Sequence, residues 1–138
     1  MSISRDGKWL YFTNSAQGNF GRVAISEHGE KVGGVEVLAS VGVPTRAASV
    51  HFDNFALGWE GKTRIATHPS DVIKVKVQQG VVADIKNATL LLNPTSAAFG
   101  CSSERDRRTI YLTNRGTFVG NTFELVEEGV AAIDLSRF

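Results

Sequence analysis

The stretch Leu10-Tyr11-Phe12-Thr13-Asn14 returns as Arg64-Ile65-Ala66-Thr67-His68 and again as Ile110-Tyr111-Leu112-Thr113-Asn114. Each copy has an alternating apolar pattern and ends in Thr followed by a polar residue. A polar turn precedes each copy, and a loop with another short apolar run follows it. Alternation of this kind is typical of a β-strand with one buried face, so each copy predicts the same hairpin.

The repeat has a period of about 50 residues, which is typical of β-propellers, where each repeat forms one four-stranded sheet. Short Val-, Ile-, Tyr- and Phe-rich runs alternate with Gly, Asn, Asp and Ser throughout the chain, and we find no useful stretch with a helical period. We therefore predict an all-β fold. The 138 residues form a single domain of three four-stranded blades of a β-propeller, at about 1–40, 47–93 and 94–138.

The predicted strands follow the apolar runs, and a long loop is expected over 115–128. In order, the strands are Ile3–Ser4, Trp9–Asn14, Gly21–Ser26, Val35–Ala39, Val50–Leu57, Thr63–Thr67, Val72–Val77, Ala88–Leu92, Ser96–Phe99, Thr109–Thr113 and Val130–Leu135. Trp59, Phe52, Phe55 and Phe99 are expected in the core between the blades.

Two strand edges stay open in this arrangement. The first repeat has almost no first strand, and the third has no fourth strand. An unpaired edge offers free N–H and C=O groups to another chain. We therefore predict a propeller that is incomplete as a single chain. Its open edges would join a second copy, which brings the total to six blades, or the missing half of the propeller.

Composition excludes several other classes. The formal net charge of +1 gives no electrostatic reason to expect nucleic acid or an anionic membrane as a partner. No apolar run approaches the length of a membrane span, and the first residues lack the apolar core of a signal peptide. Cys101 is the only cysteine, so no intrachain disulfide is expected, which fits a cytoplasmic location. The basic cluster Arg105, Arg107 and Arg108 is interpreted as a solvated turn.

Four segments of the chain resemble the C-terminal half of the SMP-30/gluconolactonase/LRE-like propellers. They occur in the same order as in that family, and they resemble its fungal branch most closely. They are LYFTNSAQGNFGRVAI (10–25), FDNFALGWEGKTRIATHPSDVIKV (52–75), PTSAAFG (94–100) and GVAAIDL (129–135). The resemblance implies a six-bladed propeller that acts on a small-molecule substrate. Its best-known members are lactonases, so lactone-type hydrolysis by the complete propeller is the implied activity.

The resemblance also implies one divalent cation, calcium or zinc, in the channel. Asp53 stands where a metal-binding Asp of the family would be, although Asn54 replaces the usual Gly. The family's Asn ligand would fall before Met1, and its Glu ligand further upstream. This chain therefore keeps one of the three metal ligands, and a propeller without a metal is the equally weighted alternative.

Two other functions stay open. These segments also resemble fungal biosynthetic propellers that work without a metal. Some of those propellers are pericyclases of the hetero-Diels–Alder type in natural-product (secondary) metabolism. Such catalysis depends on a shaped pocket that orients the reacting parts. The other alternative is a half-propeller without catalytic activity that assembles into an oligomer or binds a partner.

The candidate site residues lie at the starts or ends of predicted inner strands. Asp53 and His51 are two positions apart on one strand, hence on one face, where a carboxylate and an imidazole can act as a base or hold a metal. Thr95 and Ser96 could offer hydroxyl groups to a channel ligand. His68 is a candidate ligand-binding residue, but its equivalence to Asn14 and Asn114 also favours a structural role in a turn.

Overall fold

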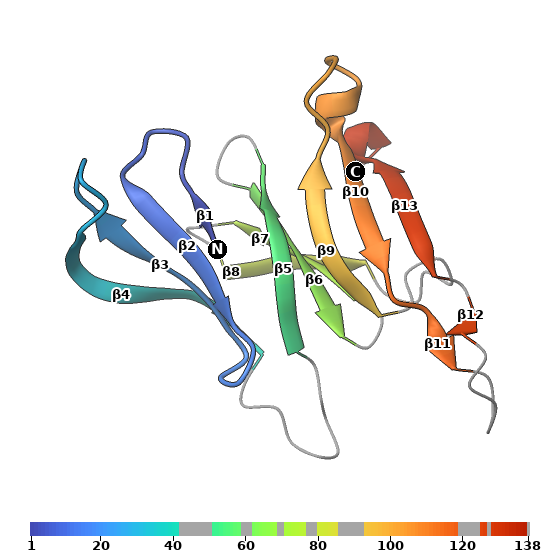
Figure 1. Ribbon diagram of the computed structural model, residues 1–138, viewed down its shortest axis with the longest axis horizontal. Helices are drawn as coiled ribbons and strands as arrows, with labels where there is room; N and C mark the ends of the chain where they lie inside the picture. The colour runs from blue at the N-terminus through green and yellow to red at the C-terminus, as the bar shows by residue number, and fades with distance from the viewer. Residues whose placement is uncertain are drawn as a thin grey trace.

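In the computed structural model, three larger antiparallel sheets lie side by side, and a short two-stranded sheet lies next to the last of them (Figure 1). The structure describes residues 1–41, 51–58, 62–68, 71–76, 80–85, 93–118, 125–126 and 128–137. Apart from two short 3-10 turns, at Asp106–Arg108 and Leu135–Arg137, the regular structure of these residues is β-strand. The predicted all-β fold of propeller blades is confirmed.

Blade 1 contains four strands in the order β1-β2-β3-β4. The first copy of the repeat is β2, and the expected stub of a first strand is present as the two-residue β1. The bounds are Ser2–Ile3 for β1, Trp9–Asn14 for β2, Asn19–Ile25 for β3 and Lys31–Ser40 for β4.

Blade 2 also has four strands, in the order β5-β6-β7-β8. The predicted fourth strand at Ala88–Leu92 was misplaced, because β8 begins directly at Gly80, and Ala88–Leu92 and Trp59 lie outside the described residues. The fourth strand of this blade therefore begins eight residues before the predicted one. The bounds are His51–Leu57 for β5, Lys62–His68 for β6, Asp71–Lys76 for β7 and Gly80–Ile85 for β8.

Blade 3 contains three strands in the order β13-β10-β9, so the predicted absence of a fourth strand holds for the described residues. Within the predicted loop 115–128 the chain forms a small ribbon of β11 and β12, which the sequence did not indicate. The bounds are Pro94–Phe99 for β9, Thr109–Asn114 for β10, Thr117–Phe118 for β11, Leu125–Val126 for β12 and Gly129–Asp134 for β13.

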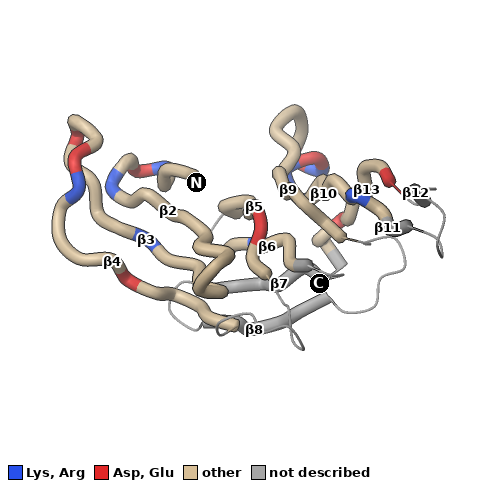
Figure 2. The backbone as a smooth tube through the Cα atoms, turned by 60° about the horizontal axis from the view of Figure 1, so that its bottom comes forward, with Lys and Arg blue, Asp and Glu red and all other residues tan. Residues whose placement is uncertain are grey.

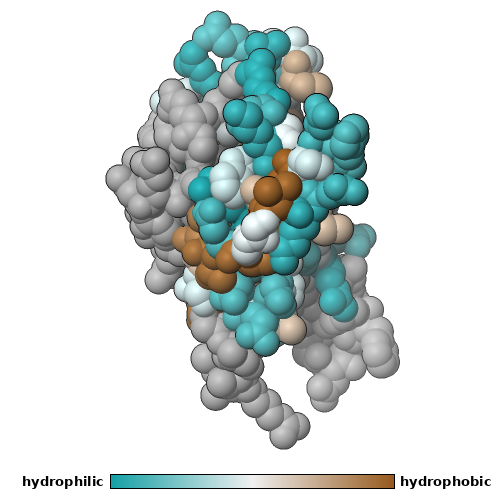
Figure 3. Space-filling model, turned by 90° about the vertical axis from the view of Figure 1, so that its left-hand side faces the viewer, coloured by the Kyte–Doolittle hydropathy of each residue, from teal (hydrophilic) through white to brown (hydrophobic). Residues whose placement is uncertain are grey.

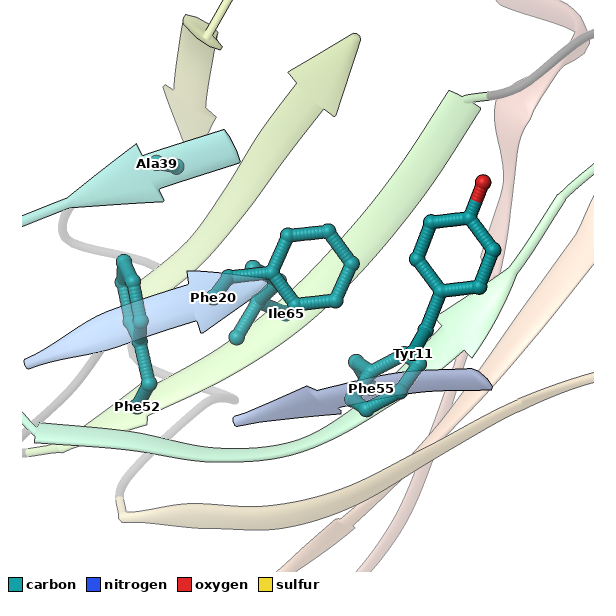
Figure 4. Packing of buried hydrophobic residues seen from close by; sticks show 6 residues of the cluster. All are labelled: Tyr11, Phe20, Ala39, Phe52, Phe55 and Ile65. Atoms are coloured by element: carbon teal, nitrogen blue, oxygen red, sulfur yellow. The ribbon is translucent and has the colours of Figure 1, made fainter. Parts of the chain in front are cut away.

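Aromatic side chains join blade 1 to blade 2 (Figure 4). The fully buried ring of Phe20, on β3, stacks on Tyr11 with 5.9 Å between ring centroids. The same ring meets the edge of Phe55, on β5, at 5.0 Å. Phe52 and Ile65 complete the cluster from blade 2, which confirms the core position predicted for Phe52 and Phe55. Such pairs add directional attraction to the burial of apolar area.

A second, aliphatic cluster joins blade 2 to blade 3. Ile110 and Leu112 of β10 are fully buried and pack with Ala97 of β9 and Ala56 of β5. Phe99 lies at the edge of this cluster, as predicted. The repeat therefore serves two joints, because Ile65 of the second copy faces blade 1 while Ile110 and Leu112 of the third face blade 2.

None of the described helices is long and apolar enough to cross a membrane.

One glycine is required by close packing inside blade 1. A Cβ added to Gly21 would lie 2.8 Å from the backbone oxygen of Glu36 on β4 and 3.4 Å from Cζ of Phe12 on β2. Gly34, on the same strand as Glu36, has open space where its Cβ would be. Gly21 and Gly34 therefore make a matched pair for substitution.

We expect Gly21→Ala to destabilise the protein by about 1–3 kcal/mol, because the methyl group overlaps a backbone atom that cannot rotate away. Gly34→Ala should change stability by no more than about 0.5 kcal/mol. Urea unfolding of both variants measures the difference. Equal stability of the two variants would contradict the close approach of β3 to β4.

Candidate functional site

The inner strands of blades 2 and 3, β5 and β9, lie side by side. Both begin at the same end of their sheets, the lower end in Figure 1. Four of the five predicted site residues lie on these two strands: His51 and Asp53 on β5, and Thr95 and Ser96 on β9. The acidic segment of β5 in Figure 2 is Asp53, because the strand has no other acidic residue. The topology thus brings both pairs to one edge.

A hydrogen bond from blade 1 holds the start of β5. The Ser15 hydroxyl, in the turn after β2, donates to the backbone oxygen of Phe52 at 2.5 Å. That turn is itself closed by the Asn14 side chain, whose Oδ1 accepts from the backbone N–H of Gln17 at 3.2 Å. Asn14 therefore has the turn-closing role expected of the polar residue at the end of the repeat.

The start of β9 is held by bonds to the end of β10. The hydroxyl oxygens of Thr95 and Thr113 lie 3.0 Å apart, and Thr95 Oγ1 is also 3.4 Å from the backbone oxygen of Thr113. Nearby, the Asn93 side chain donates to the backbone oxygen of Gly116 at 2.8 Å. Ser96 pairs with Thr113 in the ladder, and among the described residues its hydroxyl has no hydrogen-bond partner. Ser96 is therefore the hydroxyl at this edge that can turn to a ligand.

A β-bulge separates His51 from the regular part of β5. The ladder pairs Phe52 with Thr67 and then Phe55 with Ile65, so two residues, Asp53 and Asn54, stand where one would fit. The simple alternation that predicted His51 and Asp53 on one face is therefore interrupted next to Asp53. Within the described structure the half-buried His51 imidazole forms no bond with Asp53.

The described residues do not form a metal site by themselves. No three His, Cys, Asp or Glu side chains come together anywhere in the described part of the chain. Calcium takes six to eight oxygen ligands, and zinc sites usually have three or four protein ligands. Asp53 contributes one carboxylate, so a cation at this edge would need ligands from beyond the described residues.

His68 ends β6, where its backbone pairs with His51. This pairing places its Cα beside the candidate edge. Its side chain is outside the described part of the chain, so its proposed contact with a ligand stays a prediction.

A hollow of about 470 Å³ lies at the opposite end of blade 3, beside the turn after β9. Asp106 organises it by accepting hydrogen bonds from the Ser102 N–H at 2.9 Å, the Ser102 hydroxyl at 2.7 Å and the Tyr111 hydroxyl at 2.7 Å. These donors lower the pKa of Asp106 to about 2, and the hydrogen bond to the Asp106 carboxylate raises the pKa of Tyr111. This carboxylate was not among the predicted site residues, although the Ser-rich turn before it was a usable signal.

We interpret the Asp106 hollow as structural. Asp106 already accepts three hydrogen bonds, and a Cβ on Gly100 would lie 2.1 Å from its Oδ1, so the turn is built around this side chain. Its donors order the turn, and the neighbouring arginines Arg105, Arg107 and Arg108 are exposed, as predicted.

The sheets pack face to face, and polar residues lie where the inner strands begin. This arrangement defines part of a β-propeller. Its solved structural neighbours include luciferin-regenerating enzyme (TM-score 0.71, 19% identity, covering 94% of this chain and 42% of that one). Another is a calcium-binding protein, regucalcin, from Agrobacterium tumefaciens (TM-score 0.64, 18% identity, covering 80% of this chain and 35% of that one).

No protein-family model and no curated protein matches the chain. At these identities the neighbours establish the fold, and the chain spans less than half the length of either one. The placement in a fungal branch stays a prediction.

We expect the Asp106 turn to lose stability in acid. The lowered pKa means that Asp106 stabilises the fold above about pH 4 and that this stabilisation is lost as the pH falls towards 2. Asp106→Asn should therefore be less stable than the native protein at neutral pH, and the difference should shrink over that range. Urea unfolding from pH 7 to pH 2.5 measures it, with Glu30→Gln as an exposed-carboxylate control. A constant difference at every pH would contradict the role of the charge.

Proposed function

We propose that this chain is part of a small-molecule enzyme of the SMP-30/regucalcin-like propeller type that hydrolyses lactone-type substrates. The observation that carries the proposal is the meeting of β5 and β9 at one end, with His51, Asp53, Thr95 and Ser96 at their starts. The likeness to luciferin-regenerating enzyme and regucalcin supports the choice of superfamily.

The reaction needs a base, and this edge has two candidates. In lactone hydrolysis the oxygen of water bonds to the carbonyl carbon, the bond from that carbon to the ring oxygen breaks, and the product is a hydroxy acid. Asp53 or His51 would take the proton from water and return it to the ring oxygen. The Ser96 hydroxyl would donate a hydrogen bond to the substrate and orient it.

A divalent cation would polarise the lactone carbonyl if the complete propeller holds one. Asp53 is the residue of this chain that would bind it. One carboxylate does not form a metal site, and the roles proposed for Asp53, His51 and Ser96 do not require the cation.

Replacing the carboxylate tests the proposal. We expect Asp53→Asn to lower kcat for a simple δ-lactone by about 100-fold or more, because an amide cannot accept the proton. Metal content by mass spectrometry should fall if Asp53 is also a cation ligand. Glu27→Gln, an exposed carboxylate on blade 1, is the matched control and should keep full activity. Unchanged turnover in a folded Asp53→Asn protein would contradict the hydrolase and favour a shape-driven reaction such as that of the pericyclases.

We also propose that a second copy of this chain completes the ring. Apolar side chains are left uncovered on the outer faces of blades 1 and 3: Val35 is 54% and Val37 57% exposed on β4, and Val130 is 68% exposed on β13. Figure 3, which looks at the blade 1 side, shows hydrophobic residues gathered in the middle and ringed by hydrophilic ones.

These residues lie on the faces turned away from blade 2. Val37 pairs with Gly21, and the residue next to Gly21, Phe20, points to blade 2, so Val37 points away from blade 2. On blade 3, Ile110 and Leu112 point to blade 2, so Tyr111, which lies between them, points away from it. A two-fold axis along the channel would place blade 1 of each copy on blade 3 of the other. Both apolar faces would then be buried in a closed ring.

We expect sedimentation equilibrium to give twice the mass of one chain. Val37→Asp should weaken the dimer at least about 10-fold, because it puts an unpaired charge into the apolar contact. His28→Asp, in an exposed turn of the same blade, should leave the mass unchanged. A native protein that stays monomeric at high concentration would contradict closure by a second copy.

A further inference from the structure

One arginine is enclosed at the joint between blades 2 and 3. Arg64 lies in the middle of β6, and its side chain points to blade 3, because its ladder partner Ala56 packs with Ala97, Ile110 and Leu112. The flanking residue Ile65 points the other way, into the aromatic cluster with blade 1. The residue as a whole is only 6% exposed, and Nη1 of its guanidinium is fully buried.

The described structure supplies no acceptor for this buried cation. Arg64 Nη1 is fully buried and has no hydrogen-bond partner. Burial lowers the pKa of Arg64, and no carboxylate among the described side chains opposes that effect. The guanidinium nevertheless keeps its charge, because its ordinary pKa lies far above neutral. On this face, Ala56 on β5 and Ala66 on β6 have no side-chain acceptor. The ladder partner on β7 is Lys74, whose side chain lies outside the described residues.

Arg22 is an arginine of the same fold whose charge has partners. Its side chain, on β3, is more exposed than Arg64, yet it bonds to Glu36 at 2.9 Å and lies 3.8 Å from the centre of the Trp9 ring. In the backbone view of Figure 2, β3 carries a basic segment and β4 an acidic one. The better buried arginine thus has the poorer set of partners, which is the reverse of what stability alone would select.

We propose that Arg64 is an anion-binding residue that takes the carboxylate of a small organic acid at the joint between blades 2 and 3. A guanidinium presents parallel N–H groups in one plane, and a carboxylate accepts two of them at once. The anion would supply the acceptor that Nη1 lacks. This site does not depend on the hydrolase proposal, because Arg64 lies at the level of Ala56 in the ladder and not at the start of β5.

Sodium acetate is the probe, with sodium chloride to keep the ionic strength constant. In nitrogen-15 NMR spectra, the side-chain Nε–H signal that disappears in Arg64→Met should move with acetate and reach a plateau. Arg105→Met, which removes an exposed arginine, should keep that signal and its response. A signal that does not move, or that moves equally with chloride, would overturn the carboxylate site.

Thermal unfolding gives an independent readout. Acetate at one hundred times its Kd should raise the folded-to-unfolded ratio of the native protein about 100-fold. Arg64→Met should show no such gain, and without acetate it should be at least as stable as the native protein, because an apolar side chain replaces an unpaired charge. Arg64→Lys serves as a second variant if Arg64→Met does not fold. An acetate response that either variant shares in full would overturn the proposal.

Discussion

The packing of side chains between neighbouring sheets is the constraint on which the rest of this structure depends. The ladders run within each blade, and no described ladder joins one blade to the next. The ring of Phe20 therefore has to hold blade 1 against Phe55, and Ile110 and Leu112 have to hold blade 3 against Ala56. The relative placement of β5 and β9, and with it the candidate edge, follows from these two joints.

The two joints differ in what they leave unsatisfied. The joint between blades 1 and 2 is aromatic and is supplemented by the bond from Ser15 to the backbone of Phe52. The joint between blades 2 and 3 uses smaller side chains and encloses the charge of Arg64. A buried charge without a partner weakens a fold unless a ligand supplies one, so the joint between blades 2 and 3 is the one that would gain from binding an anion.

Much of the fold could be predicted because a strand pattern has a period of two and is read locally. The three copies of the repeat appear as β2, β6 and β10, and both the short β1 and the three-stranded blade 3 follow from apolar runs that are short or missing. β8 was misplaced because Gly80–Ile85 and Ala88–Leu92 are both apolar runs, and their order in the sequence does not say which of them pairs with β7. The bulge at Asp53 was not predicted, since it depends on how β5 aligns with β6.

By itself, the sequence determined the strands, their repeat and the apolar faces that need covering, because these depend on the order of neighbouring residues. It also indicated that His51, Asp53, Thr95 and Ser96 lie at the starts of two inner strands. Only the tertiary structure decided that Ser96 keeps its hydroxyl available while Thr95 bonds to Thr113, and that Arg64 is enclosed without an acceptor. The physical reason is that burial and hydrogen bonding depend on residues from other blades, which come together only when the sheets pack.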